Sequence, residues 1–374
     1  MKFILPILAL SMSLMAQTSS FAETTKEIGV THNIHEFNKN ISNIDNLKEI
    51  SFVKGSLLIH NNLLESIDSL SNLLTVKNKF NASCNNLSSI KDLNMLEIVG
   101  GTLDLSENKI SSISGFKNLS YVGGDLLLDY NKLTSITGFS SLVTIHGNLD
   151  LYENKLKTLT GFNELNYIGG DLILTNNELT KIPFSNLKSV EGTIFLSRNK
   201  LSNINEFRKL SYVGGDLLLN HNKLTTLTGL KSLMYVKNDI LLDGNLLTDL
   251  KGLDSLKIVN GDLYLNNNNL EHLDGFNIVS IQGNLYLNNN NLLKINPLKS
   301  LNYIGGNLYL IHNTNLENLR PLKNVVLKEG SSIFLDPREY DKKLDSNTYI
   351  CKSIKKKTIF IPGLVYSDVC EVNK

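Results

Sequence analysis

Residues Tyr121 to Phe139 read YVGGDLLLDYNKLTSITGF, and variants of this phrase return along most of the chain. An asparagine near its centre recurs twelve times, at intervals of 23 residues except for two intervals of 22. These asparagines are Asn62, Asn85, Asn108, Asn131, Asn154, Asn177, Asn199, Asn222, Asn245, Asn268, Asn290 and Asn313. A fixed period of this length is typical of a solenoid, in which stacked copies bury one continuous core. The 374 residues are therefore predicted to form one elongated domain.

The apolar positions within one copy indicate how each coil is built. After Asn131 they are Leu133, Ile136, Phe139, Leu142, Ile145, Leu149 and Leu151. The last two alternate with polar residues at the two-residue period of a strand, whereas the three-residue spacings suit turns. The pattern predicts a right-handed coil of about 12 repeats of 22–23 residues, with one long parallel β-sheet. Turns and short irregular segments are expected on the outer side, with little α-helix.

Two polar or small positions recur in register with the strands. The repeated asparagine is predicted to bond the backbone of adjacent coils, because an interior amide can both donate and accept. It is assigned no ligand role. The second column consists of glycine with asparagine as its substitute, at Gly55, Asn78, Gly101, Gly124, Gly147, Gly170, Gly192, Gly215, Asn238, Gly261, Gly283 and Gly306. Because these two residues tolerate a positive φ, a left-handed or bulged residue is expected at each strand entry.

The ends of the chain depart from the period. Lys2, an apolar run and the sequence Ser20-Phe21-Ala22 predict a signal peptide over residues 1–22, cleaved near Ala22. We expect an N-terminal cap over 23–54, a repeat domain over 55–335 and a C-terminal cap over 336–374. No later apolar run approaches the roughly 20 residues of a membrane span. The protein is therefore predicted to be secreted, periplasmic or at the cell surface.

Charge and cysteine content add little about a partner. The chain has 37 basic and 36 acidic residues, so its net charge favours no class of ligand. Cys351 and Cys370 share the segment after the repeats, and an exported protein can oxidise them, so we predict a disulfide between them. Cys84 is left over as a free thiol or, alternatively, as an intermolecular bridge.

The pattern L-x-L-x-x-N-x-L, seen in Leu126 to Leu133, resembles the leucine-rich repeat family over about residues 55 to 335. The entry Val122-x-Gly124-x-Leu126 is similar to the variant found in receptor L-domains. The segments INPL (295–298) and LRPL (319–322) are similar to bacterial internalins. The resemblance implies a non-catalytic protein-recognition scaffold, and some relatives are adhesins or invasion factors.

One outward column of the predicted sheet becomes continuously apolar in the C-terminal half. Alternation along a strand points every second residue out, and stacking turns each such position into a column. The column contains Ile173, Phe195, Leu218, Leu241, Tyr264, Tyr286 and Tyr309. Such a stripe either packs strand against strand or forms an interface with a partner. Earlier copies place Asn81, Asp104 and Asp150 there without an apolar ladder, which favours the interface.

Acidic residues flank this stripe. One neighbouring column carries Asp125, Asp171, Asp216, Asp239 and Asp262, and the other carries Asp129 and Asp243. With Asp104, Asp150, Glu107 and Glu153, the face has eleven acids against Lys79 and Arg198. Such a face is either merely solvated or selects a basic partner, and a bound cation is a weaker alternative. We assign Asp216, Asp239, Asp243 and Asp262 to the candidate binding site.

Other chemistry is weakly represented. His32 and His35 with Glu36 could hold a metal only on a helix, and a surface feature is the more ordinary interpretation. No nucleophile motif or phosphate loop is present, so no catalytic residue, metal or cofactor is predicted. A short lysine cluster at 355–357 is weak evidence for an acidic ligand. The sequence favours an exported scaffold that binds protein, or less favourably a glycan, and no nucleic acid. The alternatives are a self-associating envelope protein and an enzyme with its site in the caps.

Overall fold

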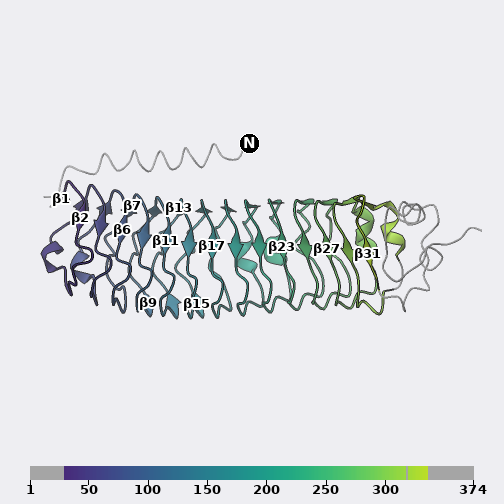
Figure 1. Cartoon of the computed structure of the whole chain (residues 1–374), viewed down its shortest axis with the longest axis horizontal. Coiled ribbons are helices and arrows are strands. Elements are labelled where there is room, and N and C mark those ends of the chain that lie inside the picture. Colours follow the sequence, from purple (N-terminus) through teal and green to yellow (C-terminus); the bar gives the residue numbers. More distant parts are fainter. Residues whose placement is uncertain (1–28, 317–318, 336–374) are drawn as a thin grey trace, which may run out of the picture.

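The computed structural model describes residues 29–316 and 319–335, which form a solenoid of stacked coils (Figure 1). Each coil contributes a strand to a parallel sheet of 14 strands, which we call the first sheet. Its strands are, in spatial order, β2 (Ile34–His35), β4 (Leu57–Leu58), β6 (Phe80–Asn81), β8 (Leu103–Asp104), β11 (Leu126–Leu127), β14 (Leu149–Asp150), β17 (Leu172–Ile173), β19 (Ile194–Phe195), β21 (Leu217–Leu218), β23 (Ile240–Leu241), β25 (Leu263–Tyr264), β27 (Leu285–Tyr286), β29 (Leu308–Tyr309) and β31 (Ile333–Phe334). The predicted long parallel sheet is confirmed.

A second line of strands runs beside the first sheet, separated from it by a short corner in each coil (Figure 1). Ten strands form one sheet: β1 (Gly29–Val30), β3 (Phe52–Val53), β5 (Thr75–Val76), β7 (Ile98–Val99), β10 (Tyr121–Val122), β13 (Thr144–Ile145), β16 (Tyr167–Ile168), β18 (Ser189–Val190), β20 (Tyr212–Val213) and β22 (Tyr235–Val236). Four more continue the line as a separate sheet: β24 (Ile258–Val259), β26 (Ser280–Ile281), β28 (Tyr303–Ile304) and β30 (Val326–Leu327). We call this whole line the second sheet. Sequence analysis did not anticipate it.

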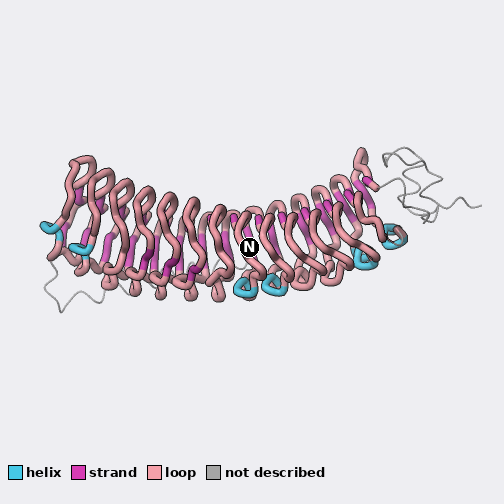
Figure 2. The backbone as a smooth tube through the Cα atoms, turned by 90° about the horizontal axis from the view of Figure 1, so that it is seen from below, coloured by secondary structure: helices cyan, strands magenta, loops and turns pink. Residues whose placement is uncertain are grey.

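The remaining side of each coil is mostly irregular. A sheet of three strands lies there, β9 (Ser112–Ile113), β12 (Ser135–Ile136) and β15 (Thr158–Leu159). Elsewhere short 3-10 helices occur: η1 (Asp45–Leu47), η2 (Asp68–Leu70), η3 (Asn205–Phe207), η4 (Thr228–Leu230), η5 (Asn296–Ser300) and η6 (Arg320–Asn324). Proline is the second residue of η5 and η6, where its fixed φ suits a first turn and its missing N–H is not needed. Figure 2 shows the solenoid as a shallow arc with these helices along its outer edge.

The helical content matches the expectation of little α-helix. In residues 29–316 and 319–335 every helix is of the 3-10 type, and the longest have 5 residues. No helix in this part of the chain is long and apolar enough to span a membrane. The predicted signal peptide, the predicted C-terminal cap and the Cys351–Cys370 disulfide lie outside the described residues. The described part of the predicted N-terminal cap stacks as a coil, because β2 pairs with β4 in register.

The recurring asparagine forms the predicted ladder. Asn131 Nδ2 donates to the carbonyl of Leu105 in the preceding coil at 3.0 Å and to that of Leu128 in its own coil at 3.1 Å. Its Oδ1 accepts the N–H of Ile110 at 3.0 Å. All twelve ladder asparagines are buried, and each repeats this pattern. The ladder therefore satisfies backbone groups inside the turn that follows each strand of the first sheet.

The left-handed backbone predicted for the glycine column is not found. None of these glycines has a positive φ, and the recurring left-handed residue lies directly before the ladder asparagine. The left-handed residues are Asn61, Cys84, Glu107, Tyr130, Glu153, Asn176, Arg198, His221, Gly244, Asn267, Asn289 and His312. The glycines instead provide space. A Cβ on Gly170 would lie 2.1 Å from Asn148 Oδ1, and that oxygen accepts the N–H of Asp171.

Candidate functional site

The predicted apolar stripe exists and is longer than the sequence indicated. The outward residues of β17 through β29 pair in exact register from Ile173 to Tyr309 along the first sheet. All of them are half-buried. Phe334 of β31 pairs with Tyr309 and extends the column. Sequence analysis missed Phe334 because it follows Tyr309 by 25 residues and breaks the period, although alternation in Ile333-Phe334-Leu335 is a usable signal.

Four aromatic rings stack face to face at the C-terminal end of the stripe. The ring centroids of Tyr264 and Tyr286 lie 4.3 Å apart, those of Tyr286 and Tyr309 4.6 Å, and those of Tyr309 and Phe334 4.5 Å. Their planes are within 8° of parallel. Neighbouring rings therefore cover one another's faces, and a ligand meets ring edges and hydroxyls. This arrangement disfavours cation–π contacts and sugar stacking, both of which need an open ring face.

Two of the tyrosine hydroxyls are bonded within the sheet. Tyr264 donates its hydroxyl proton to Asp262 Oδ2 at 3.0 Å, and Asn307 Nδ2 donates to the hydroxyl of Tyr309 at 3.1 Å. Burial and the neighbouring Asp262 carboxylate raise the pKa of Tyr264. Burial likewise raises the pKa of Tyr286. The stripe is therefore a preorganised surface of neutral phenols, and its stacking also stabilises the sheet.

The aspartates beside the stripe have a structural role that sequence analysis missed. Asp216 Oδ1 accepts the N–H of Asp239 at 2.9 Å, and Asp239 Oδ1 accepts the N–H of Asp262 at 2.6 Å. Asp262 Oδ1 in turn accepts the N–H of Asn284 at 2.6 Å. This second ladder uses one oxygen of each aspartate, and the glycine column leaves room for it. The second carboxylate oxygen of Asp216 and of Asp239 remains available for a partner.

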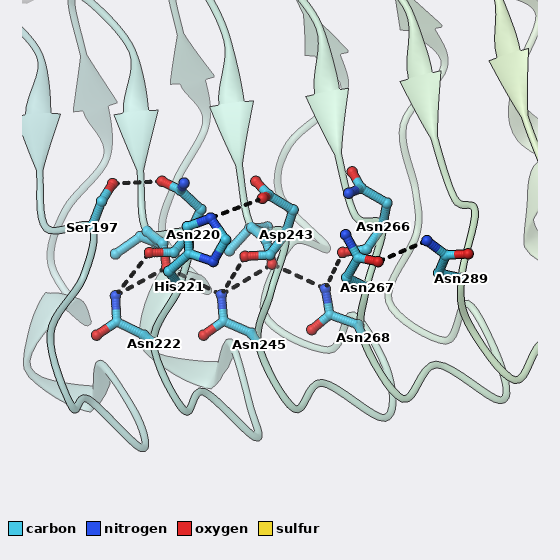
Figure 3. Close-up of polar contacts among 12 residues, drawn as sticks. Ser197, Asn220, His221, Asn222, Asp243, Asn245, Asn266, Asn267, Asn268 and Asn289 are labelled. Carbon is cyan, nitrogen blue, oxygen red and sulfur yellow. Dashed lines mark hydrogen bonds and ion pairs between the residues drawn. The ribbon is translucent and has the colours of Figure 1, made fainter.

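On the other side of the stripe lies a row of polar side chains (Figure 3). Asp243 Oδ2 lies 3.8 Å from Nε2 of His221, and Asn289 donates to Asn267 Oδ1 at 2.8 Å. Burial raises the pKa of Asp243, and the nearby His221 partly offsets this rise. Asn266 Oδ1 is buried and has no hydrogen-bond partner among the described residues. Because Asn266 follows Tyr264 by two residues, both side chains point to the same face of the sheet. This buried acceptor therefore lies beside the aromatic stack.

The acids of the N-terminal half form a separate acidic patch, defined here as Asp104, Glu107, Asp125, Asp129, Asp150, Glu153 and Asp171. Asp104 and Asp150 accept the N–H groups of Ser106 and Tyr152, at 3.1 and 2.9 Å. In the part of the chain that the structure describes, no three acidic, histidine or cysteine side chains are arranged to hold a metal ion. The acids are spread one or two per coil, so the patch offers charge without a coordination cage.

Asp129 should make stability depend on pH. Burial and the charge of Asp150 raise its pKa to about 6, above the ordinary value of about 3.9. Since the folded state binds this proton more readily, the ionised carboxylate destabilises the fold above about pH 6, and stability is regained as pH falls towards 4. Asp129→Asn is therefore expected to raise the urea midpoint at about pH 7. The difference between the midpoints at about pH 7 and about pH 5 should be smaller for this variant than for the parent. Exposed Glu65→Gln is the control, and an equal effect of both changes would contradict this assignment.

The histidine pair before the repeats does not form the helical site that a metal would require. His35 lies in strand β2, and the structure places no helix at residues 32–36. The rings of Phe37 and His60 stack at 4.8 Å, and His35 meets Phe37 edge-on at 5.8 Å. These contacts pack the first coils together. The helical arrangement considered for His32, His35 and Glu36 is therefore not formed.

Cys84 is the one cysteine within the described residues and forms no disulfide with them. It is half-buried and adopts a left-handed φ of 51° before the ladder residue Asn85. Burial and the adjacent Glu107 carboxylate raise the pKa of its thiol. A raised pKa makes the thiol less reactive, since the thiolate is the nucleophile.

The chain resembles several solved structures at low sequence identity. No protein-family model matches it, and no curated protein matches it in sequence. An internalin from Listeria monocytogenes is 20% identical, with coverage of 79% of this chain and 86% of that one and a TM-score of 0.47. A leucine-rich repeat protein from Bacteroides thetaiotaomicron is 17% identical, with coverage of 87% and 45% and a TM-score of 0.49. YopM of Yersinia pestis, a leucine-rich effector protein, is 20% identical, with coverage of 84% and 82% and a TM-score of 0.43.

These similarities are too distant to carry a function, so the fold assignment rests on the coils themselves. The repeat phrase supplies the leucines of the interior, the asparagine ladder closes each turn, and the strands pair in register from β2 to β31. The protein thus has the architecture of a leucine-rich repeat solenoid.

Proposed function

We propose that this protein is a non-catalytic scaffold that binds another protein across the C-terminal half of the first sheet. The observation that carries the proposal is an ordered apolar stripe, from Ile173 to Phe334, whose side chains are half-buried and point outward in register. A protein that covers the stripe would remove these side chains from water.

The flanking groups favour a protein partner with exposed N–H donors or basic side chains. Asp216 and Asp239 each keep one carboxylate oxygen available, and Asn267 and Asn289 are exposed. Complementary charge would speed encounter with such a partner. A glycan is disfavoured because the stacked rings offer no open face. Nucleic acid is disfavoured because the acids of this face would repel phosphates.

Export is part of the proposal. The predicted signal peptide would deliver the protein to the periplasm, the cell surface or the medium, where surface proteins of the same or another cell are available. The similarity of the INPL and LRPL segments to internalins favours a role in host interaction or adhesion. Detection of an N-terminus near Glu23 in protein recovered outside the cytosol would support this part of the proposal, and an intact Met1 there would contradict it.

Leu218→Lys tests the surface. Leu218 is half-buried and points outward in the stripe, so a lysine there can extend into water while removing apolar contact and repelling a basic partner. Immobilised parent and variant are exposed to extracts of cell-surface proteins, and we expect a protein retained by the parent and reduced at least about tenfold by the variant.

The matched control is Leu58→Lys, because Leu58 occupies the same column outside the continuous stripe and is also half-buried. Retention by this variant should equal retention by the parent. If every captured protein binds Leu218→Lys as well as it binds Leu58→Lys, the stripe is only sheet packing.

A further inference from the structure

The second sheet carries an exposed apolar patch in its C-terminal half. Nine large apolar side chains are exposed among the described residues, and five of them lie on this sheet or directly before one of its strands. They are Met234 at 58%, Tyr235 at 41%, Ile258 at 48%, Val279 at 37% and Val326 at 38% exposed. We call these five residues the second-sheet patch. Clustered exposure of this kind marks interaction surfaces more often than chance exposure does.

The patch residues are spread over the coils from β22 to β30, and the coil of β28 contributes none of them. The ring of Tyr235 stacks on that of Tyr212 at 5.3 Å, and the N–H of Val279 donates to the carbonyl of Lys257, which precedes Ile258. Ile258 pairs with Ser280 in β26, and Tyr303 of β28 pairs with Val326 in β30. The patch therefore spans the coils from β22 to β30 on one face.

Basic residues surround this apolar patch. Lys188, Lys237, Lys257 and Lys328 occupy outward positions next to the strands of the second sheet, and all four are exposed. Glu191 and Glu329 are the acids at comparable positions from β18 onward. None of the four ion pairs found within the described residues involves any of these lysines. The apolar contact area of the patch is thus surrounded by residues with a net positive charge.

A complementary surface exists on the same molecule. The acidic patch on strands β8 to β17 of the first sheet has seven carboxylates, and the outward positions of these strands contain no lysine or arginine, although Lys109, Lys132 and Lys155 are exposed in the turns that follow. Both surfaces are built from coils of one solenoid, so their side chains repeat at the same spacing of roughly 4.8 Å per coil. Lys237 and Lys257 lie next to β22 and β24, on adjacent coils, so two solenoids lying alongside each other can match this lysine pair to acids on adjacent coils.

We propose that the second-sheet patch binds the acidic patch of a second copy of this chain. The two surfaces differ, so the interface is heterologous: in a pair, one copy keeps its acidic patch free and the other keeps its second-sheet patch free, and each can bind a further copy. Apolar area supplies the contact, and charge complementarity sets the register. The proposal does not rest on the proposed function, because the stripe from Ile173 to Phe334 is a separate surface. An anionic lipid surface would also suit the lysines, but it leaves the acidic patch without a role.

Sedimentation velocity of the purified full-length protein tests the inference. The parent should show a mass that rises with concentration, more at low than at high salt, because screening weakens charge pairing. A variant with Lys237→Glu and Lys257→Glu loses one surface, and a variant with Glu107→Lys and Glu153→Lys loses the other. All four residues are exposed, and Arg198 already occupies the position equivalent to Glu107 and Glu153 in another coil, so both variants should fold. Each is expected to associate at least about tenfold more weakly than the parent.

An equimolar mixture of the two variants provides the decisive comparison. Each retains one intact surface, so the mixture should form a one-to-one dimer that cannot grow, at concentrations where each variant alone is monomeric. Melting curves confirm that both variants are folded. A monomeric parent at all concentrations, undiminished association of either variant, or a mixture that stays monomeric would overturn the proposal. Binding of a monomeric parent to phosphatidylglycerol vesicles, lost on Lys237→Glu and Lys257→Glu, would assign the patch to lipid instead.

Discussion

Asn268→Ala is expected to lower the free energy of unfolding by about 2–4 kcal/mol, because it leaves buried backbone groups without their partner. Asn268 Nδ2 approaches the carbonyls of Leu242 and Leu265 at 3.0 and 3.2 Å, and its Oδ1 accepts the N–H of Leu247 at 3.1 Å. Leu247 is fully buried, so its N–H would lose its only partner. Urea unfolding followed by far-ultraviolet circular dichroism measures the loss, since the chain has no tryptophan.

Asn269→Ala is the matched control for this prediction. Asn269 is the next residue in the same run of four asparagines, but its side chain is exposed. Its backbone N–H bonds to the carbonyl of Leu247, and alanine retains that bond. The control should unfold within about 0.5 kcal/mol of the parent. Equal losses for the two changes would show that the ladder contributes no specific stability.

Phe162→Ala is expected to cost about 3–5 kcal/mol, as for other large-to-small changes in a packed core. Phe162 is fully buried between Phe139 and Phe184, with ring centroids at 5.3 and 6.3 Å. These rings belong to a column with Phe116 and Phe207 on the side of the coils away from the first sheet. Removing one ring leaves a cavity that the neighbouring coils cannot close, since each is fixed by its own ladder.

Phe162→Leu is the control, because leucine fills the same position in other coils, as at Leu230 and Leu253. It should retain most of the stability in the same urea measurement. Comparable losses for alanine and leucine would indicate that the aromatic column is not closely packed.

The coil was predictable from the sequence because its determinants are local and repeated. The leucines at two-residue spacing produce the first sheet. Asn131 and its equivalents are buried, and the side-chain amide of each bonds backbone groups in the turn after the strand. The second sheet was not predicted because most of its strands show a single buried residue, such as Val213 in β20, which gives no alternation to detect. Its exposed patch was missed for the same reason.

The roles of the glycine column and of the aspartates could be assigned only from the three-dimensional structure. The glycine column was expected to provide a left-handed backbone, yet its purpose is to admit the acceptor oxygen of the neighbouring coil, as at Gly170 and Asn148. The aspartates were expected to serve a partner, yet Asp216 and Asp239 also hold the coils together. Contacts between residues about 23 positions apart depend on side-chain direction, which a repeat pattern does not specify.

Site-specific photo-crosslinking tests the central claim that the stripe of the first sheet is the binding surface. A benzoylphenylalanine at Phe195, an outward aromatic position in the stripe, should crosslink to a protein partner in cell-surface extracts. The same residue placed at Ile98, an outward position of the second sheet, should not crosslink to that partner. A partner joined through position 195 alone is the result that we predict. A partner joined equally through both positions, or only through position 98, would contradict the assignment of the binding surface to the stripe.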